Sequence, residues 1–305
     1  MTRKTAIIVV GFNRPEYLIE LLEFLSINDF QNIFVSIDSH KEGYIDDEIK
    51  ALAESEFSEF SWIFRDLNLG IGKHIPTAVS EVLENFDNCV VLEDDVRVSA
   101  KALNSGINLL SQRLPENYMT IGFFGGLWFK PWKLLLFGKN CWRETEYFSA
   151  WGWGIQRESW SKYNHYLKKD LIELQLANSD IWNQKTPTSR RRWLRRFMIV
   201  ADSPDFTWDF QMQYATYVSK SVHLLPTFST AENCGFDDSR STNTKSKKPR
   251  WHRGRKLNCE IELKIREHGL IQKVLVYLDK LTWAGDSNLR SLVLSSRLYL
   301  RRIFS

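Results

Sequence analysis

Short apolar runs alternate with amphipathic helical stretches through the first hundred residues, and this alternation constrains the fold more than any other feature. Four runs rich in Val, Ile and Phe predict buried strands; they span residues 5–12, 32–39, 60–68 and 88–96. The stretches between them have helical apolar spacing; they span residues 14–27, 46–56 and 74–86. Strands that alternate with helices form mostly parallel sheets covered by helices on both faces. We therefore predict an α/β fold built on such a sheet.

An acidic triplet, Glu93, Asp94 and Asp95, directly follows the fourth run. Like charges at the end of a buried strand repel one another and lose hydration, so a compensating cation is expected. Carboxylates suit Mn²⁺ or Mg²⁺, whose remaining ligands are water and substrate phosphate, and the triplet lacks the His and Cys ligands of zinc. Ligands bind beyond the carboxyl ends of parallel strands, where Asn13 and Asp38 also fall. The triplet thus predicts a metal and nucleotide diphosphate site, although a helix cap or a solvated turn would also explain it.

Glycines precede the third helical stretch in "NLGIGKHIPTAV", residues 68–79. The pattern is not a P-loop, because the spacing is wrong and His74 stands where Ser or Thr would bind the metal. Gly70 and Gly72 could still let the backbone approach a ligand that Lys73 or His74 touches. A turn before a helix also favours glycine, so both interpretations stay open.

Composition excludes several classes of protein. The four cysteines are widely spaced without a CxxC pair, so the sequence indicates neither a zinc site nor a disulfide framework, and a reducing cytoplasm fits best. No run approaches the roughly 18 apolar residues that a membrane-spanning helix needs. The 12 Trp and 19 Phe either line a sugar or base site or belong to the core.

The net charge of +4 is unevenly distributed. Basic stretches lie at residues 189–197, 245–256 and 289–305, and a solvated surface explains each. The last stretch could also form a basic amphipathic helix in peripheral contact with an anionic membrane at its inner face. No nucleic-acid reader motif is present, so no nucleic-acid partner is expected.

Seven segments, taken together and in order, resemble the GT-A nucleotide-sugar glycosyltransferases, and among these the bacterial relatives of N-acetylglucosaminyltransferase I. The segments are "VVGFNRPEYL", "VSIDS", "RDLNLGIGKH", "VVLEDDVRVS", "SAWGWGIQRESW", "TWDFQMQY" and "LPTFSTAENCGF". The resemblance implies a GT-A domain over residues 1–236. Its nucleotide-binding half would span about 1–100 and its acceptor-binding half about 101–236. We expect a basic loop or linker at 237–256 and a small, basic helical extension at 257–305.

The resemblance also implies roles for the residues near the strand ends. The last acid of the triplet, Asp95, would bind the metal, while Glu93 and Asp94 would flank the sugar and ribose. Asp38 would contact uracil, and His74 matches a histidine that touches the base.

Two further segments carry implied roles. Asn13 or Arg14 would face the nucleotide. In "TWDF", Asp209 matches the catalytic base, although the family pattern reads Trp-Asp-Asp and Phe210 stands here, so a shift by one position would leave the base unassigned. An N-terminal helix cap would equally explain Asp209. "AWGWG" suits a loop that closes over the sugar, with Trp151 or Trp153 stacking on the acceptor, and core packing is the competing explanation.

These features predict a metal-dependent, inverting glycosyltransferase that moves a sugar from a UDP-sugar to a glycan or lipid-linked carbohydrate in cell-surface polysaccharide synthesis. A sugar-phosphate nucleotidylyltransferase is an alternative, but its Gly-rich, Arg-bearing signature near the first strand is missing. A non-catalytic carbohydrate-binding or assembly protein with the same fold is the other alternative.

Overall fold

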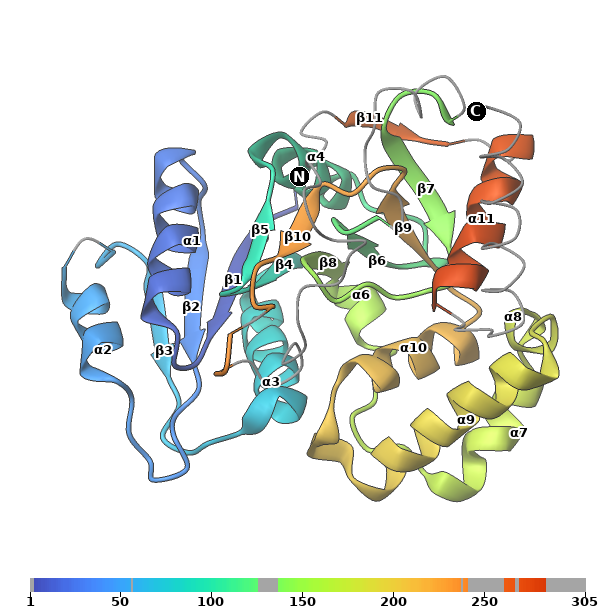
Figure 1. Cartoon of the computed structure of the whole chain (residues 1–305), viewed down its shortest axis with the longest axis horizontal. Helices are drawn as coiled ribbons and strands as arrows, with labels where there is room; N and C mark the ends of the chain where they lie inside the picture. The colour runs from blue at the N-terminus through green and yellow to red at the C-terminus, as the bar shows by residue number, and fades with distance from the viewer. Residues whose placement is uncertain are drawn as a thin grey trace, which may run out of the picture.

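A nine-stranded mixed sheet forms the centre of the computed structural model, which describes residues 3–55, 57–125, 137–236, 238–240, 261–266 and 269–283 (Figure 1). The strand order is β11-β7-β9-β6-β8-β4-β1-β2-β3, and β10 and β5 pair separately. The strands are β1 (Thr5–Gly11), β2 (Ile33–Ile37), β3 (Ser61–Phe64), β4 (Asn88–Glu93), β5 (Val96–Val98), β6 (Tyr118–Gly122), β7 (Cys141–Thr145), β8 (Trp153–Gln156), β9 (Val222–Pro226), β10 (Ala231–Asn233) and β11 (Glu262–Ile265).

Helices cover both faces of this sheet. They are α1 (Pro15–Ile27), α2 (Asp47–Glu54), α3 (Gly70–Asn85), α4 (Ala100–Ser111), α6 (Arg157–Trp160), α7 (Ile172–Ala177), α8 (Asp180–Asn183), α9 (Pro187–Asp202), α10 (Asp209–Val218) and α11 (Leu270–Trp283). Two 3-10 turns are η1 (Lys169–Leu171) and η2 (Pro204–Phe206). The predicted α/β class is confirmed.

The four N-terminal strands form the parallel part of the sheet, in the order β3-β2-β1-β4. Side chains alternate between the faces of a strand. In β1, Ile7 and Val9 pack toward α1 and α4, whereas Ile8 and Val10 pack toward α3 and α10. The prediction of buried strands is therefore confirmed for β1, β2 and β4, whereas β3 lies at the sheet edge and is partly exposed.

The strand β8 runs antiparallel between β4 and β6, which makes the sheet mixed. It contains Trp153 and Gly154, which sequence analysis expected in a loop over the sugar. A Cβ atom at Gly154 would lie 2.8 Å from Leu110 Cδ1 and 3.2 Å from the Cys89 carbonyl oxygen, so this crowded position favours glycine. The glycines of "AWGWG" therefore suggest a loop although part of the segment is a central strand.

Aromatic residues fill a separate cluster between α7, α8, α9 and α10. Trp182, Trp193, Phe197 and Tyr217 pack there with ring centroids 5.6–6.2 Å apart. Much of the aromatic surplus is therefore core, which was one of the two explanations that the composition left open.

The chain returns to the sheet after residue 260. Strand β11 pairs parallel with β7, and α11 packs on β7 through a buried ion pair in which Arg143 Nη2 lies 2.8 Å from Asp279 Oδ1. The predicted extension at 257–305 thus contains an unexpected strand as well as a helix. Most of the basic loop and all of the tail at 289–305 lie outside the described residues. Of the helices described, none is long and apolar enough to cross a membrane.

Candidate active site

Three strands end at the same edge of the sheet and bring their following residues together. Because β1, β2 and β4 are parallel, Asn13, Asp38 and Glu93 all lie at or just beyond their carboxyl ends. The backbone closes this edge, since Asp38 N–H donates to the Gly11 carbonyl at 3.1 Å and Asp94 N–H donates to the Val10 carbonyl at 2.9 Å. The grouping expected from the sequence is therefore present.

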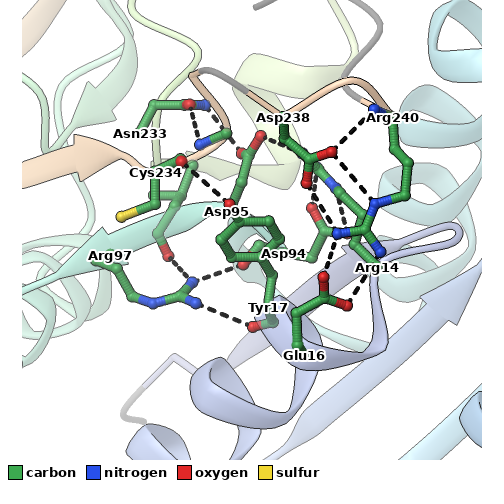
Figure 2. Close-up of polar contacts among 12 residues, drawn as sticks. Arg14, Glu16, Tyr17, Asp94, Asp95, Arg97, Asn233, Cys234, Asp238 and Arg240 are labelled. Atoms are coloured by element: carbon green, nitrogen blue, oxygen red, sulfur yellow. Dashed lines mark hydrogen bonds and ion pairs between the residues drawn. The ribbon is translucent and has the colours of Figure 1, made fainter. Parts of the chain in front are cut away.

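Arg14 joins the last two acids of the triplet (Figure 2). Its Nη1 donates to Asp95 Oδ2 at 2.8 Å, and its Nε donates to Asp94 Oδ2 at 3.2 Å. A third bond links Nη2 to Asp94 Oδ1. Both acidic residues are at most 5% exposed. The sequence predicted a metal ion as the compensating positive charge. In this structure the Arg14 guanidinium supplies that charge.

The pKa values at this centre reflect burial in competition with the ion pairs. Burial raises the pKa of Asp94 to about 7, although the Arg14 charge acts to lower it. Burial lowers the pKa of Arg14, but the neighbouring Asp94 and Asp95 charges outweigh it, and the net shift is upward. The guanidinium is therefore charged throughout the physiological pH range.

A strap formed by residues 231–236 and 238–240 runs over the triplet (Figure 2). Asn233 Nδ2 donates to Asp95 Oδ1 at 2.9 Å, and the Cys234 N–H donates to the Asp95 carbonyl at 2.7 Å. A Cβ atom at Gly235 would lie 2.2 Å from Asp95 Oδ2, so only glycine fits. The sequence predicted that this segment belongs to the domain, but it predicted no role for Asn233 or Gly235.

Arg240 anchors the C-terminal end of the strap to α1 through an ion pair. Its guanidinium forms ion pairs with Glu16 in the first turn of α1 and with Asp238, the latter at 2.9 Å (Figure 2). Tyr17 Oη approaches the Cys234 carbonyl at 3.4 Å. The strap and the start of α1, which carries Arg14, therefore form one connected unit.

Asp38 holds the start of α3 at the same sheet edge. Its carboxylate accepts backbone N–H bonds from Ser39 at 3.1 Å, Leu69 at 2.9 Å and Gly70 at 2.8 Å. Burial raises its pKa, and these N–H bonds oppose that shift. Asp38 thus has a structural capping role at the position where the resemblance implies uracil recognition.

Lys73 and His74 point to different environments on α3. Lys73 is exposed, whereas His74 is 3% exposed and its Nε2 lies 2.8 Å from Ser36 Oγ. Burial lowers the pKa of His74 to about 3, so the ring is neutral at pH 7. Of these two residues, only Lys73 has an exposed side chain.

Asp209 approaches the triplet from a distant part of the chain. It is the first residue of α10, where Thr207 donates a hydroxyl hydrogen bond to its Oδ1. Burial raises the pKa of Asp209. Burial also raises the pKa of Glu93 well above its ordinary value; the charges of Asp95 and Asp94 add to that shift, and Asp209 adds further. The charge of Asp209 therefore reaches Glu93 although the two residues are far apart in sequence.

The tryptophans near the site have unlike surroundings. Trp153 is 1% exposed, with its ring 4.9 Å from Trp208 and 5.5 Å from Phe148, which leaves no open ring face for a sugar. Trp151 is partly buried and contacts Phe236 of the strap with ring centroids 5.7 Å apart. The stack of Trp153 on Trp208 positions the start of α10, a function that sequence reasoning did not assign to Trp208.

The triplet fits a hard divalent cation through its chemistry, but not without rearrangement. All of its donors are carboxylates, and Mg²⁺ or Mn²⁺ is commonly held by one or two of these together with water and phosphate. Among the described residues, no group of three or more His, Cys, Asp or Glu side chains is placed to hold a metal ion. Asp95 is the candidate ligand, and an ion at its Oδ2 would replace the Arg14 guanidinium.

No family model and no curated protein matches the chain. Solved structures do match it, at low sequence identity. The mannosyltransferase PcManGT from Pyrobaculum calidifontis, in complex with GDP-Man and Mn²⁺, is 12% identical over 72% of this chain and 70% of its own, with a TM-score of 0.39. GalNAc-T7 with UDP, GalNAc and Mn²⁺ is 12% identical over 76% of this chain and 44% of its own, with a TM-score of 0.43. A mannose-1-phosphate geranyltransferase from Thermus thermophilus is 13% identical over 76% of this chain and 77% of its own, with a TM-score of 0.35. At these scores the likeness does not decide an activity.

Proposed function

We propose that this chain is a metal-dependent, inverting glycosyltransferase of the GT-A type that moves a sugar from a UDP-sugar to a carbohydrate acceptor. The proposal is supported by the placement of Asp209 at the start of α10, directly after Trp208. The Trp208 ring stacks 4.9 Å from that of Trp153, which pairs with Val91 in the strand that ends at Glu93. Transfer with inversion requires a charged site for the leaving diphosphate and a separate base that faces it. The arrangement supplies one candidate for each.

The donor side of the proposed reaction belongs to the triplet and the start of α1. Asp95 would hold a Mn²⁺ or Mg²⁺ ion, which supplies positive charge to the leaving diphosphate when it is bound. Arg14 would turn from Asp95 toward a phosphate oxygen, and Asn233 would keep Asp95 oriented through its 2.9 Å bond. Asn13 and Lys73 would contact the nucleotide, and Trp151, which packs against Phe236 of the strap, would lie beside the sugar.

The acceptor side belongs to α10. Asp209 would accept the proton of the acceptor hydroxyl as that oxygen bonds to the sugar. Its raised pKa makes it a stronger base than an exposed aspartate, and the Thr207 hydroxyl holds the carboxylate in place. The Trp153–Trp208 stack fixes the backbone from which Asp209 extends.

The test is release of UDP from a panel of UDP-hexoses with Mn²⁺, with native protein and Asp209→Asn. We expect turnover to fall by about a hundredfold or more, the typical contribution of a general base, while UDP binding by calorimetry is unchanged. The matched control is Asp205→Asn, because Asp205 lies nearby in η2 but is exposed and bonded to His165 at 2.7 Å. A non-catalytic binding protein would show no turnover in any of the three. Equal loss in both variants would remove Asp209 from the base role.

A further inference from the structure

Helix α9 presents a continuous arc of arginines beside the proposed base. Its buried residues, Ser189, Trp193, Phe197 and Val200, face the aromatic cluster. At 3.6 residues per turn, the arginines at 196, 192, 195 and 191 follow one another around the helix from the edge of that buried face out to solvent. Figure 1 shows α9 lying alongside α10, the helix that begins with Asp209.

The inner end of the arc is Arg196. It is partly buried, and its guanidinium carbon lies 4.5 Å from the ring centroid of Trp193 and 5.2 Å from that of Phe210. Phe210 directly follows Asp209. Burial lowers the pKa of Arg196 and the Arg192 charge lowers it further, whereas Asp209 opposes both. The arc therefore starts within electrostatic reach of the proposed base.

Several other partly or fully buried arginines form ion pairs, and the partly buried Arg266 donates instead to backbone carbonyls. Arg65 pairs with Glu81, Arg97 with Glu20 and Arg143 with Asp279. In contrast, within the part of the chain that the structure describes, Arg191, Arg195 and Arg196 form no ion pair with a carboxylate. The exposed Arg191 and Arg195 lie on the solvent side of the helix, whereas the partly buried Arg196 rests on two aromatic rings within reach of the Asp209 charge.

We propose that the acceptor is an anionic glycan whose phosphate or carboxylate groups bind the α9 arginines while its reacting hydroxyl lies at Asp209. This inference rests on the proposed function. A guanidinium matches the planar geometry of both anions through paired hydrogen bonds. The arc extends outward from the base, so successive anionic units of an oligomer can bind successive arginines along the exposed side of the helix.

The test measures binding of three soluble oligomers by calorimetry at low and moderate salt. They are an oligogalacturonate, which carries carboxylates, a short inorganic polyphosphate, and a neutral maltooligosaccharide. The proteins are native, Arg191→Glu/Arg195→Glu, and the control Lys101→Glu/Lys273→Glu, which has the same charge change at exposed positions on α4 and α11. We expect native and control proteins to bind an anionic oligomer in a salt-sensitive way, and the α9 variant to bind it at least tenfold more weakly. Preference between the two anionic probes distinguishes carboxylate from phosphate recognition.

The proposal is overturned if the neutral oligomer binds native protein equally well, if the control loses as much affinity as the α9 variant, or if α9 binds only phosphatidylglycerol vesicles. The thermal shift by UDP with Mn²⁺ is measured on all three proteins, and we expect it to be equal. If anionic oligomers bind at α9 but no protein responds to UDP, the arginine surface stands and the donor-site proposal fails.

Discussion

The guanidinium of Arg14 bridges the last two acids of the triplet, with Nη1 2.8 Å from Asp95 Oδ2 and Nε 3.2 Å from Asp94 Oδ2. Any divalent cation at Asp95 must therefore compete with a charge that the protein already provides. This relationship makes nucleotide, metal and Arg14 interdependent: a phosphate that attracts Arg14 would free an oxygen of Asp95 for the metal.

Replacing Arg14 with Ala leaves two nearly buried carboxylates without their partner. We expect the free energy of unfolding to fall by about 3 kcal/mol, since breaking a buried pair by removing one member is strongly destabilising. Added Mn²⁺ should raise the melting temperature of this variant more than that of native protein. The control is Arg3→Ala, whose partner Glu158 is 49% exposed, so its loss should cost about 1 kcal/mol or less. Urea unfolding measures both, and equal costs would mean that Arg14 does not stabilise the triplet.

Gly235→Ala should disrupt the strap while every residue proposed to bind metal or nucleotide keeps its identity. The added methyl group would lie 2.2 Å from Asp95 Oδ2 and 2.9 Å from Arg14 Nη1, so the strap or the carboxylate must shift. We expect at least a tenfold loss of UDP affinity in the presence of Mn²⁺, measured by calorimetry. Gly269→Ala is the matched control, because nothing lies within 4 Å of its added Cβ. Unchanged UDP binding in Gly235→Ala would place the nucleotide elsewhere.

Stability should depend on pH through a buried histidine. His223 is 0% exposed, lies 2.7 Å from Thr120 Oγ1 and 3.0 Å from Thr216 Oγ1, and burial lowers its pKa to about 3. An unfolded histidine titrates near 6.5, so between about pH 6.5 and 3 the unfolded state binds the extra proton. The contribution of His223 to stability is therefore complete above about pH 6.5 and is lost as the pH falls, by about 1.4 kcal/mol per unit.

The comparison that isolates this effect is native protein against His223→Gln, by urea unfolding at several pH values between 7 and 5. Carboxyl groups with raised pKa, such as Asp94, act in the opposite direction but are common to both proteins. We expect a shallower loss of stability on acidification in the variant. Identical slopes would show that His223 is not the titrating group.

Local pattern was enough to predict the parallel half of the fold. The apolar runs of β1, β2 and β4 are buried on both faces, and their ends coincide with Asn13, Asp38 and Glu93 as expected. The pattern failed at β8, because crowding by residues from other elements favours glycine at position 154 and hides the strand. Strand β11 was missed because its pairing depends on β7, a strand more than a hundred residues earlier.

At the site, the residue types predicted which residues gather at the sheet edge better than they predicted what each residue contacts there. The triplet called for a cation, but no local pattern shows that Arg14, eighty residues earlier, is bonded to it. Asp38 was expected to face the nucleotide, and its three backbone N–H donors come from Ser39 and the start of α3. Trp153 was proposed for the acceptor, yet its alternation in β8 turns it toward Trp208 and the core. Roles of this kind depend on contacts between distant segments.

A nucleotide and metal site at Asp95 is tested most directly by titrating UDP, with and without Mn²⁺, into native protein and Asp95→Asn and measuring the melting temperature. Ligands that bind the folded state raise its stability by mass action. We expect UDP with Mn²⁺ to stabilise native protein, UDP without Mn²⁺ to do so less, and Asp95→Asn to lose the Mn²⁺-dependent part. No response to UDP in native protein, or an equal response in Asp95→Asn, would contradict a nucleotide and metal site at the acidic triplet.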